Sequence, residues 1–414
     1  MYPDAAAEKP QGGSAETRDT MPSSFRLSGI TFLSCVLIAA YAFGQKSESS
    51  HGSPGAGDTP EIAGPLATDL SPALEPEAIG KAMRKVGDWQ LEKSRNDFNQ
   101  DWTFAALYRG YLAAAESLHD DAYRDALLEA GKKFEWQLGR RETHADDQAI
   151  GYIYLKLYRQ YHDAKMLEPT KAEFDRILPL PDVCTETCPP WHDEKTPRWW
   201  WCDALFMAPP VWAELYSITK NQAYLEAMDR QWWVTSNLLY DPNEHLYSRD
   251  TSFLDKHEAN GKKIFWSRGN GWVIAGLTEV LEEMPADYPN RARYVEQFRQ
   301  MAERLKSIQG ADGLWQPGLL GSYPLPEVSG SAFFVYAMAW GINHGILDRA
   351  TYLPVVRKGW AGLMSHIYAD GRLGSIQPIG GGPDKYQSQT SYVFGVGAFL
   401  MAGSELRELA MHRH

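Results

Sequence analysis

An acidic side chain among indole rings is the feature of this sequence that points most directly to chemistry. Asp203 follows three tryptophans at 199–201 and precedes the apolar run 204–207. Burial against indoles removes water from a carboxyl group and favours its protonated form, and a second carboxylate nearby, which we assign to Asp147, acts in the same direction. A helix start has the opposite effect because it stabilises the anion, but we expect burial and the second carboxylate to prevail. The combination predicts a general acid that is protonated at neutral pH.

Acids at the start of a helix also have an ordinary structural explanation. Asp, Ser and Asn are common N-caps, each worth about 1 kcal/mol. Asp146 or Asp147 taken alone would be assigned to this class. The functional interpretation therefore depends on the combination of acids with the tryptophans around Asp203.

Arg268 is the cation that the sequence offers to an acidic group on a ligand, because a guanidinium matches the geometry of a carboxylate. The alternative is a salt bridge that closes one end of the domain. Trp272, one helical turn further on, is either a platform for a sugar ring or part of the core.

The cysteines allow a metal site to be drawn. Cys184, Cys188, His192 and Cys202 have the residue types of a three-Cys, one-His zinc site, but two prolines at 189–190 would break a helix that aligned them. A short Cys184–Cys188 disulfide or free thiols is the better interpretation in an oxidising compartment. The chain also has no HExxH pair, calcium loop, phosphate-cradling GxxxxGK or dinucleotide fingerprint. We therefore expect neither a metal nor a cofactor.

The composition limits the partners of this 414-residue chain. Lys and Arg total 41 and Asp and Glu total 53, so the net charge is −12. Such an acidic protein is a poor general binder of nucleic acid or of an anionic membrane, and an anionic substrate would have to be held by individual basic side chains. The 15 Trp and 21 Tyr suit a carbohydrate cleft, although they also fill helical cores.

Two kinds of helix alternate after residue 76, and strand patterns are scarce. One kind has a single apolar face, and the other is apolar nearly all round, so that it must be covered on every side. The one-faced helices are predicted at 77–91, 122–138, 170–178, 222–238, 291–308 and 352–366, and the apolar ones at 102–118, 147–161, 203–219, 271–284, 330–345 and 390–406. Six such pairs predict an all-α fold, an (α/α)6 barrel of six helical hairpins with the apolar helices inside. A helical solenoid is the alternative, but its repeats are more uniform in length.

All inner helices of such a barrel run in the same direction, so their N-termini meet at one end. The residues at these starts are acids, tryptophans, amides and one arginine, at 101–102, 146–147, 201–203, 266–272, 327–331 and 387–390. We therefore expect the ligand site at this mouth, which the long connections 178–201 and 239–265 also reach.

The N-terminal part of the sequence is typical of an exported protein. Arg26 precedes an apolar run at 30–43, which is too short to span a bilayer, and small residues follow it. We predict a polar extension at 1–20, absent if translation starts at Met21, a signal peptide at 21–44, a flexible linker at 45–75 and one catalytic domain at 76–414. The product would be periplasmic or secreted, with no stable membrane insertion after signal removal; an uncleaved anchor is the alternative.

Four strings carry a family resemblance. RWWWCDALFMAPP (198–210), FWSRGNGWVIAGL (265–277), EVSGSAFFVYAMAWGIN (327–343) and YVFGVGAFLMAGSEL (392–406) resemble the unsaturated rhamnogalacturonyl hydrolases of glycoside hydrolase family 105, which are related to the unsaturated glucuronyl hydrolases of family 88. The resemblance extends from about residue 101 to the C-terminus and implies the same barrel.

The resemblance also implies a reaction. The substrate is an oligosaccharide whose non-reducing end is a 4,5-unsaturated uronic acid left by a polysaccharide lyase, for instance from a pectin-like polymer. An aspartate protonates C4 of the enol ether, water adds at C5, and the hemiketal opens. This is hydration rather than displacement at the anomeric carbon, so the usual spacing rule for two glycosidase carboxylates does not apply.

Site roles follow from the same resemblance. Asp203 matches the catalytic acid/base and Asp147 the second aspartate. The residues that match substrate contacts are His192, Trp201, Met207, Trp266, Arg268 and Trp272. Many members have a histidine after Leu246-Tyr247; here Arg249 follows instead and either supplies a second cation or pairs with Asp250. Two other functions stay open: an ordinary inverting glycosidase with Asp147 and Asp203 as base and acid, and a sugar-binding protein without catalysis.

Overall fold

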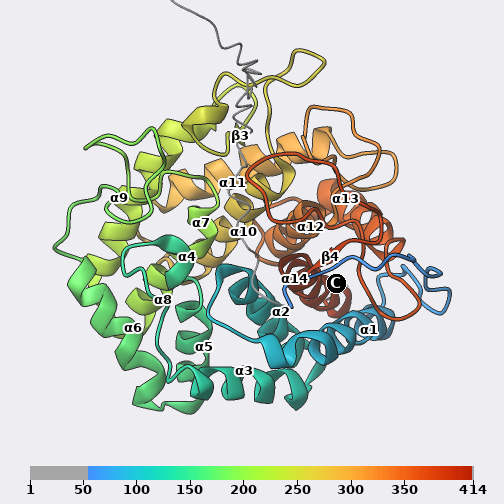
Figure 1. Cartoon of the computed structure of the whole chain (residues 1–414), viewed down its shortest axis with the longest axis horizontal. Helices are drawn as coiled ribbons and strands as arrows, with labels where there is room; N and C mark the ends of the chain where they lie inside the picture. The colour runs from blue at the N-terminus through green and yellow to red at the C-terminus, as the bar shows by residue number, and fades with distance from the viewer. Residues whose placement is uncertain (1–54, 413–414) are drawn as a thin grey trace, which may run out of the picture. The chain divides into compact units, whose positions relative to one another are not determined.

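In the computed structural model, which describes residues 55–412, one-faced and largely buried helices alternate along the chain (Figure 1). The one-faced helices are α1 (Pro76–Ser94), α3 (Asp121–Lys133), α6 (Ala164–Ile177), α9 (Gln222–Leu239), α11 (Arg291–Ser307) and α13 (Arg349–Met364). The buried helices are α2 (Trp102–Leu118), α5 (Gly151–Tyr161), α8 (Pro209–Thr219), α10 (Ser267–Glu283), α12 (Val328–Asn343) and α14 (Val393–Met411). The predicted order of the helices is confirmed, because the apolar pattern of each segment decides how many of its sides must be covered.

The six buried helices form a closed ring. Each packs on the next in the order α2, α5, α8, α10, α12 and α14, and α14 packs on α2 (Figure 1). The closing seam depends on two glycines, since a Cβ on Gly110 would collide with the backbone of Gly397, and one on Gly397 with the backbone of Ala106. The one-faced helices lie around this ring, and the fold is the predicted (α/α)6 barrel.

Two of the inner segments are interrupted where a single helix was expected. The short helices α4 (Ala145–Gln148) and α7 (Ala204–Met207) precede α5 and α8. The second break falls at Pro209, which takes the first position of α8 because its ring and missing N–H are tolerated only there. Asp146 and Asp203 consequently lie on short separate turns at the barrel mouth.

The remaining elements are short. A 3-10 turn η1 (Arg95–Asp97) follows α1, and another, η2 (Thr251–Phe253), follows the antiparallel pair β2 (Tyr240–Asp241) and β3 (Leu246–Tyr247). No helix of the described residues is long and apolar enough to cross a bilayer.

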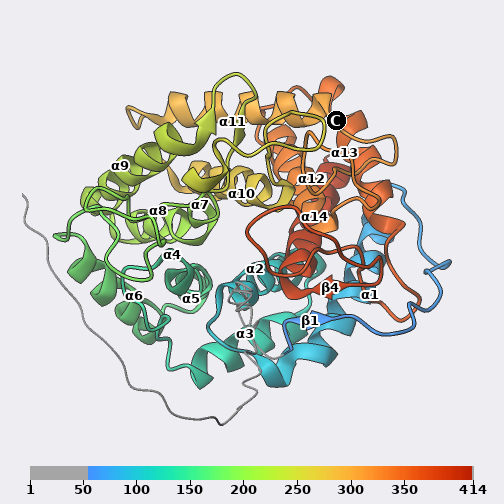
Figure 2. The same ribbon diagram turned by 45° about the horizontal axis from the view of Figure 1, so that its top comes forward.

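Residues 55–75 differ from the flexible linker that was expected at 45–75. Strand β1 (Gly57–Asp58) pairs with β4 (Ser391–Tyr392), as Figure 2 shows beside α1. Further along, the backbone N–H of Ala67 donates to the carbonyl of Ile367 at 2.8 Å. A sequence rich in Gly, Ser and Pro still offers backbone groups, and here they pair with loops of the barrel. The predicted extension at 1–20 and signal peptide at 21–44 lie outside the described residues.

Candidate active site

Asp203 lies at the mouth of the barrel, as the N-cap residue directly before α7. The residue is 9% exposed, and its Oδ2 accepts a hydrogen bond from the thiol of Cys202 at 3.3 Å. The Nε of Arg249 lies 3.9 Å from the same oxygen. Burial raises the pKa of Asp203 above its usual value, although Arg249, the Cys202 thiol and Arg268 oppose the rise. The carboxyl group is therefore shifted towards the protonated form that a proton donor needs.

Cys202 is a partner of the acid that the sequence did not identify. Its side chain is fully buried, its backbone N–H donates to the carbonyl of Arg249 at 2.8 Å, and its sulfur packs against Gly269, where an added Cβ would lie 3.0 Å from it. The thiol thus has a fixed position from which it donates to Asp203.

Replacing Cys202 with alanine is expected to raise the pKa of Asp203, because a donor to the charged carboxylate is lost. A hydrogen bond worth about 1 kcal/mol corresponds to a shift of about 0.5 to 1 pH unit in the alkaline limb of kcat/KM. Cys202→Ser keeps a donor and should leave the limb at or below its wild-type position. A pH profile of the three proteins measures this, and identical limbs in all three would show that the thiol does not act on the acid.

The carboxylate that senses Asp203 is Asp146 rather than its neighbour Asp147. Burial raises the pKa of Asp146 to about 7; Arg141 opposes this, and the negative charges of Asp203, Asp147 and Asp101 contribute to it. The side chain of Asp147 instead forms an ion pair with Arg141 and also accepts from the backbone N–H of Arg141 at 3.1 Å. Asp147 is thus paired with Arg141, and Asp146 is a second candidate for the carboxylate that acts with Asp203.

His144 caps the turn that carries Asp146. Its Nδ1 accepts from the backbone N–H of Asp146 at 3.3 Å, and its ring lies 4.9 Å from the ring of Trp201. Burial, assisted by the charge of Arg141, lowers the pKa of His144 to about 3. The imidazole is thus neutral, with its proton on Nε2. The only sequence signal for this role is the position of a histidine two residues before an acid, the arrangement of an N-cap.

Arg268 is fully buried and holds a loop. Its guanidinium donates to the carbonyls of Gln377 and Pro378, each at 2.8 Å, and lies 3.9 Å from the carboxylate of Glu327. Glu327 in turn accepts from the backbone N–H of Gln377 at 3.1 Å and from the first turn of α12. This geometry corresponds to the alternative of an ion pair that closes the barrel end, and a contact of Arg268 with the substrate stays a prediction.

Arg268→Ala is expected to destabilise the fold by about 3–5 kcal/mol, because it leaves the Glu327 carboxylate buried without its cation. The measurement is the free energy of unfolding in urea. The double variant Arg268→Met with Glu327→Gln removes both charges and should recover part of the loss. A single variant as stable as the wild type would contradict the structural role.

Arg249 is the more accessible cation beside Asp203. Its side chain is 22% exposed, and its Nη1 donates to Asp250 at 2.7 Å. Arg249 therefore pairs with Asp250 and also places a positive charge beside Asp203. The guanidinium lies 5.3 Å from the ring of Trp200. The loop with three glycines at 380–382 packs on the same guanidinium, since a Cβ added to Gly381 would lie 3.6 Å from Cζ of Arg249. Arg268 binds the start of this loop, at Gln377 and Pro378. It therefore affects the site indirectly, by holding the loop that packs on Arg249.

The tryptophans of the mouth divide by exposure. Trp272 has no exposed surface and packs on Phe206 and Phe333 at 4.8 and 4.6 Å, which agrees with the core alternative. Trp266 is 1% exposed and its indole N–H donates to Gln377 at 3.2 Å. The buried side chains beside the acid are Trp201 and Met207, whereas the half-buried Trp102 and Trp200 and the exposed Trp191 retain surface for a sugar ring.

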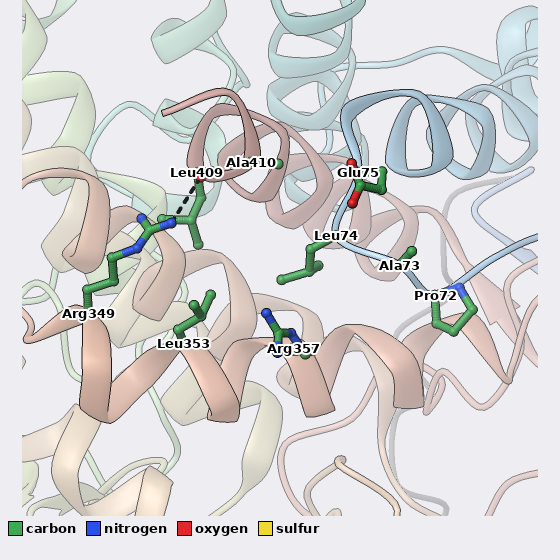
Figure 3. Close-up of a pocket in the computed structure, with 9 residues that line it drawn as sticks. All are labelled: Pro72, Ala73, Leu74, Glu75, Arg349, Leu353, Arg357, Leu409 and Ala410. Atoms are coloured by element: carbon green, nitrogen blue, oxygen red, sulfur yellow. Dashed lines mark hydrogen bonds between the residues drawn. The ribbon is translucent and has the colours of Figure 1, made fainter. Parts of the chain in front are cut away.

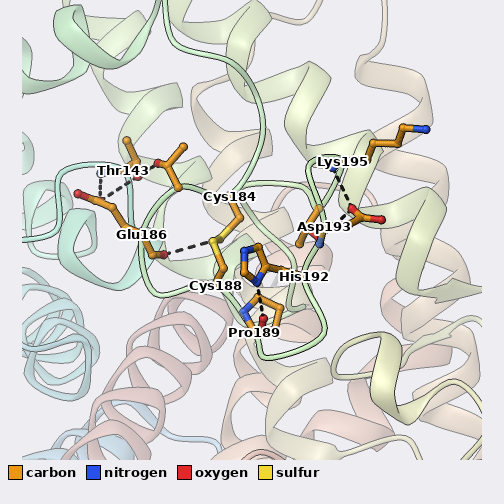
Figure 4. Close-up of a disulfide and its surroundings, with 10 residues drawn as sticks. Thr143, Cys184, Glu186, Cys188, Pro189, His192, Asp193 and Lys195 are labelled. Atoms are coloured by element: carbon orange, nitrogen blue, oxygen red, sulfur yellow. Dashed lines mark hydrogen bonds between the residues drawn. A yellow bond between two sulfur atoms is a disulfide. The ribbon is translucent and has the colours of Figure 1, made fainter.

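His192 follows a short loop that the disulfide between Cys184 and Cys188 closes (Figure 4). Its exposed ring has Nδ1 3.0 Å from the carbonyl of Pro189. The loop is tied to the acid-bearing turn, because Glu186 accepts from the N–H and hydroxyl of Thr143 at 2.8 and 2.9 Å. The fourth residue of the zinc site drawn from the sequence, Cys202, is not part of this loop and donates a hydrogen bond to Asp203. Residues 55–412 contain no cluster of three or more His, Cys, Asp or Glu side chains placed to hold a metal.

Comparisons with known proteins agree with this geometry. An unsaturated 3S-rhamnoglycuronyl hydrolase of Formosa agariphila is 44% identical over 322 residues, which are 75% of this chain and 85% of that protein. A protein of the same name from an Alteromonas species is 31% identical over 368 residues, 82% of this chain and 89% of that one. A family 88 glycosyl hydrolase from Bacteroides vulgatus has a TM-score of 0.74 at 28% identity and covers 81% of this chain and 99% of its own. The family model described as Glycosyl Hydrolase Family 88 matches residues 77–410. The resemblance seen in the sequence is confirmed, and the chain belongs to glycosyl hydrolase family 88.

Proposed function

We propose that this hydrolase removes a 4,5-unsaturated uronic acid from the non-reducing end of oligosaccharides in which the next sugar is a 3-sulfated rhamnose. The observation that carries the proposal is the buried Asp203, with a raised pKa and the Arg249 guanidinium 3.9 Å away. A proton donor and a cation side by side suit an enol ether that carries a carboxylate. The names of the two relatives support the leaving sugar, and a pectin-type galacturonic acid and rhamnose pair is the alternative.

In the proposed reaction Asp203 donates its proton to C4, and the charge that develops at C5 is captured by water. The water oxygen adds to C5 and one of its protons passes to the Asp203 carboxylate, which restores the acid. The resulting hemiketal opens and releases the sugar. Asp146 orients the water and shares a proton with Asp203, whose charge contributes to the raised pKa of Asp146; such a coupling between two carboxylates is reciprocal. Arg249 binds the uronate carboxylate, with Trp200 beneath the guanidinium.

The test uses lyase-generated disaccharides in D2O. The proposal expects loss of the ultraviolet absorbance of the conjugated double bond, release of the sugar and one deuterium at C4 of the product. Release of an intact unsaturated uronate would indicate an ordinary inverting glycosidase. Binding without turnover of sulfated, unsulfated and pectin-type disaccharides would indicate a sugar-binding protein.

We further propose that the protein is exported, to the periplasm or the medium. The Cys184–Cys188 disulfide supports this, because disulfides persist in oxidising compartments. Mass analysis of the mature protein, with cleavage expected near residue 44, tests the proposal.

A further inference from the structure

A cleft of about 570 Å³ opens beside the acid pair. It is lined by residues 99–101, 139–141 and Asp147. Three of its charged groups, those of Asp101, Arg141 and Asp147, act on the carboxyl of Asp146. Asp147 lies on the same short helix α4 as Asp146, so the cleft opens at the turn that carries Asp146, and we place the sugar that follows the uronate there.

The loop 139–141 has a fixed position against the turn that carries the acids. The backbone N–H of Gly139 donates to the carbonyl of Asp147 at 3.0 Å, and the backbone and side chain of Arg141 both bind the Asp147 carboxylate. Gly139 also has no space for a Cβ, because the Asp147 side chain packs directly on it. Because Asp147 binds both Gly139 and Arg141, it fixes the backbone position of Arg140, the residue between them.

Most polar groups of the cleft are already used. Gln100 donates to the carbonyls of Gln137 and Leu138 at 2.6 and 2.9 Å, and the amide of Asn99 donates to the carbonyl of Asp97 at 3.0 Å. Arg141 is paired with Asp147. The exposed guanidinium of Arg140 is the exception: within residues 55–412 it has no hydrogen bond or ion pair.

We propose that Arg140 binds a sulfate ester on the sugar released by the enzyme. The inference rests on the proposed function and adds to it the residue that selects the sulfate. A sulfate is permanently charged and offers paired oxygens to the fork of a guanidinium. In a chain with a net charge of −12, an anionic sugar needs such a local cation to counter the general repulsion.

The test compares the 3-sulfated and unsulfated forms of one unsaturated uronyl-rhamnose disaccharide with the wild type, Arg140→Gln and Arg140→Lys. Arg140→Gln is expected to lower kcat/KM for the sulfated form about 10-fold, mainly through KM, and to leave the unsulfated form unchanged. Arg140→Lys keeps the charge without the fork and should recover part of the loss. Equal effects on both substrates, or none on either, would overturn the proposal.

The matched control is Arg357→Gln. Arg357 is an exposed arginine in a separate cleft, formed by Pro72–Glu75, α13 and the end of α14 (Figure 3). It should turn over both substrates like the wild type. Calorimetry with rhamnose 3-sulfate against rhamnose keeps the two proposals separate. If the wild type hydrolyses neither disaccharide, the proposed function fails. Binding of rhamnose 3-sulfate by the wild type that is lost in Arg140→Gln would still support the sulfate site. Equal binding by both proteins would refute the sulfate site.

Discussion

Asp203→Asn is expected to lower kcat about 10³-fold, within the range attributed to a positioned general acid. The amide has nearly the same shape as the carboxyl group, so the Cys202 thiol and Arg249 keep their neighbour. It has no proton acidic enough to transfer to carbon, however, and the hydration of the double bond loses its first step. KM should change little, because we assign substrate binding to Arg249 and the aromatic surface. The measurement is the decrease in absorbance of the conjugated double bond.

A folding control accompanies this variant. Asp229 on α9 is also a buried acid, and it accepts hydrogen bonds from Asn290 at 2.6 Å and Tyr294 at 3.0 Å, away from the mouth. Asp229→Asn should lower the melting temperature and leave kcat unchanged, whereas Asp203→Asn should melt at or above the wild-type temperature, because an amide tolerates burial better than a carboxylate does. Wild-type turnover by Asp203→Asn would refute its assignment as the acid.

The sequence predicts the barrel because each of its helices has a local signature. A segment such as 328–343 is apolar on all sides, so it belongs to an inner ring wherever the rest of the chain goes. Asp203 was found for a similar reason, since the tryptophans that dehydrate it are its neighbours in sequence. Both inferences use only information within about one helix length.

The partners of Arg268 and of the two neighbouring aspartates depend on contacts that a local pattern does not contain. Arg268 looks like a free cation until the carbonyls of Gln377 and Pro378, about a hundred residues later, fold over it. Asp146 and Asp147 are adjacent on a four-residue turn, and no periodicity indicates which of the two faces Asp203. Arg141 distinguishes the two, because it forms an ion pair with Asp147.

A comparison of Asp146→Asn with Asp147→Asn tests that choice. The pKa of Asp146 is raised to about 7, so this carboxyl keeps its proton below that pH and loses it as the pH rises through 7. Wild-type kcat/KM should therefore fall above about pH 7. Asp146→Asn removes a negative charge near Asp203, which lowers the pKa of Asp203 and moves this limb to lower pH. The loss of the group that orients the water should also reduce kcat about 10²-fold at the optimum.

Asp147→Asn should behave differently, because this side chain holds the loop 139–141 rather than the reacting atoms. We expect kcat within about 10-fold of the wild type, and an increase in KM that is larger for a sulfated than for an unsulfated substrate, since Arg140 loses its fixed position. The reverse result, a 10²-fold loss of kcat in Asp147→Asn and a nearly normal Asp146→Asn, would return the second carboxylate to Asp147. It would also require the Arg141 ion pair to open when substrate binds, because that pair holds the Asp147 carboxylate.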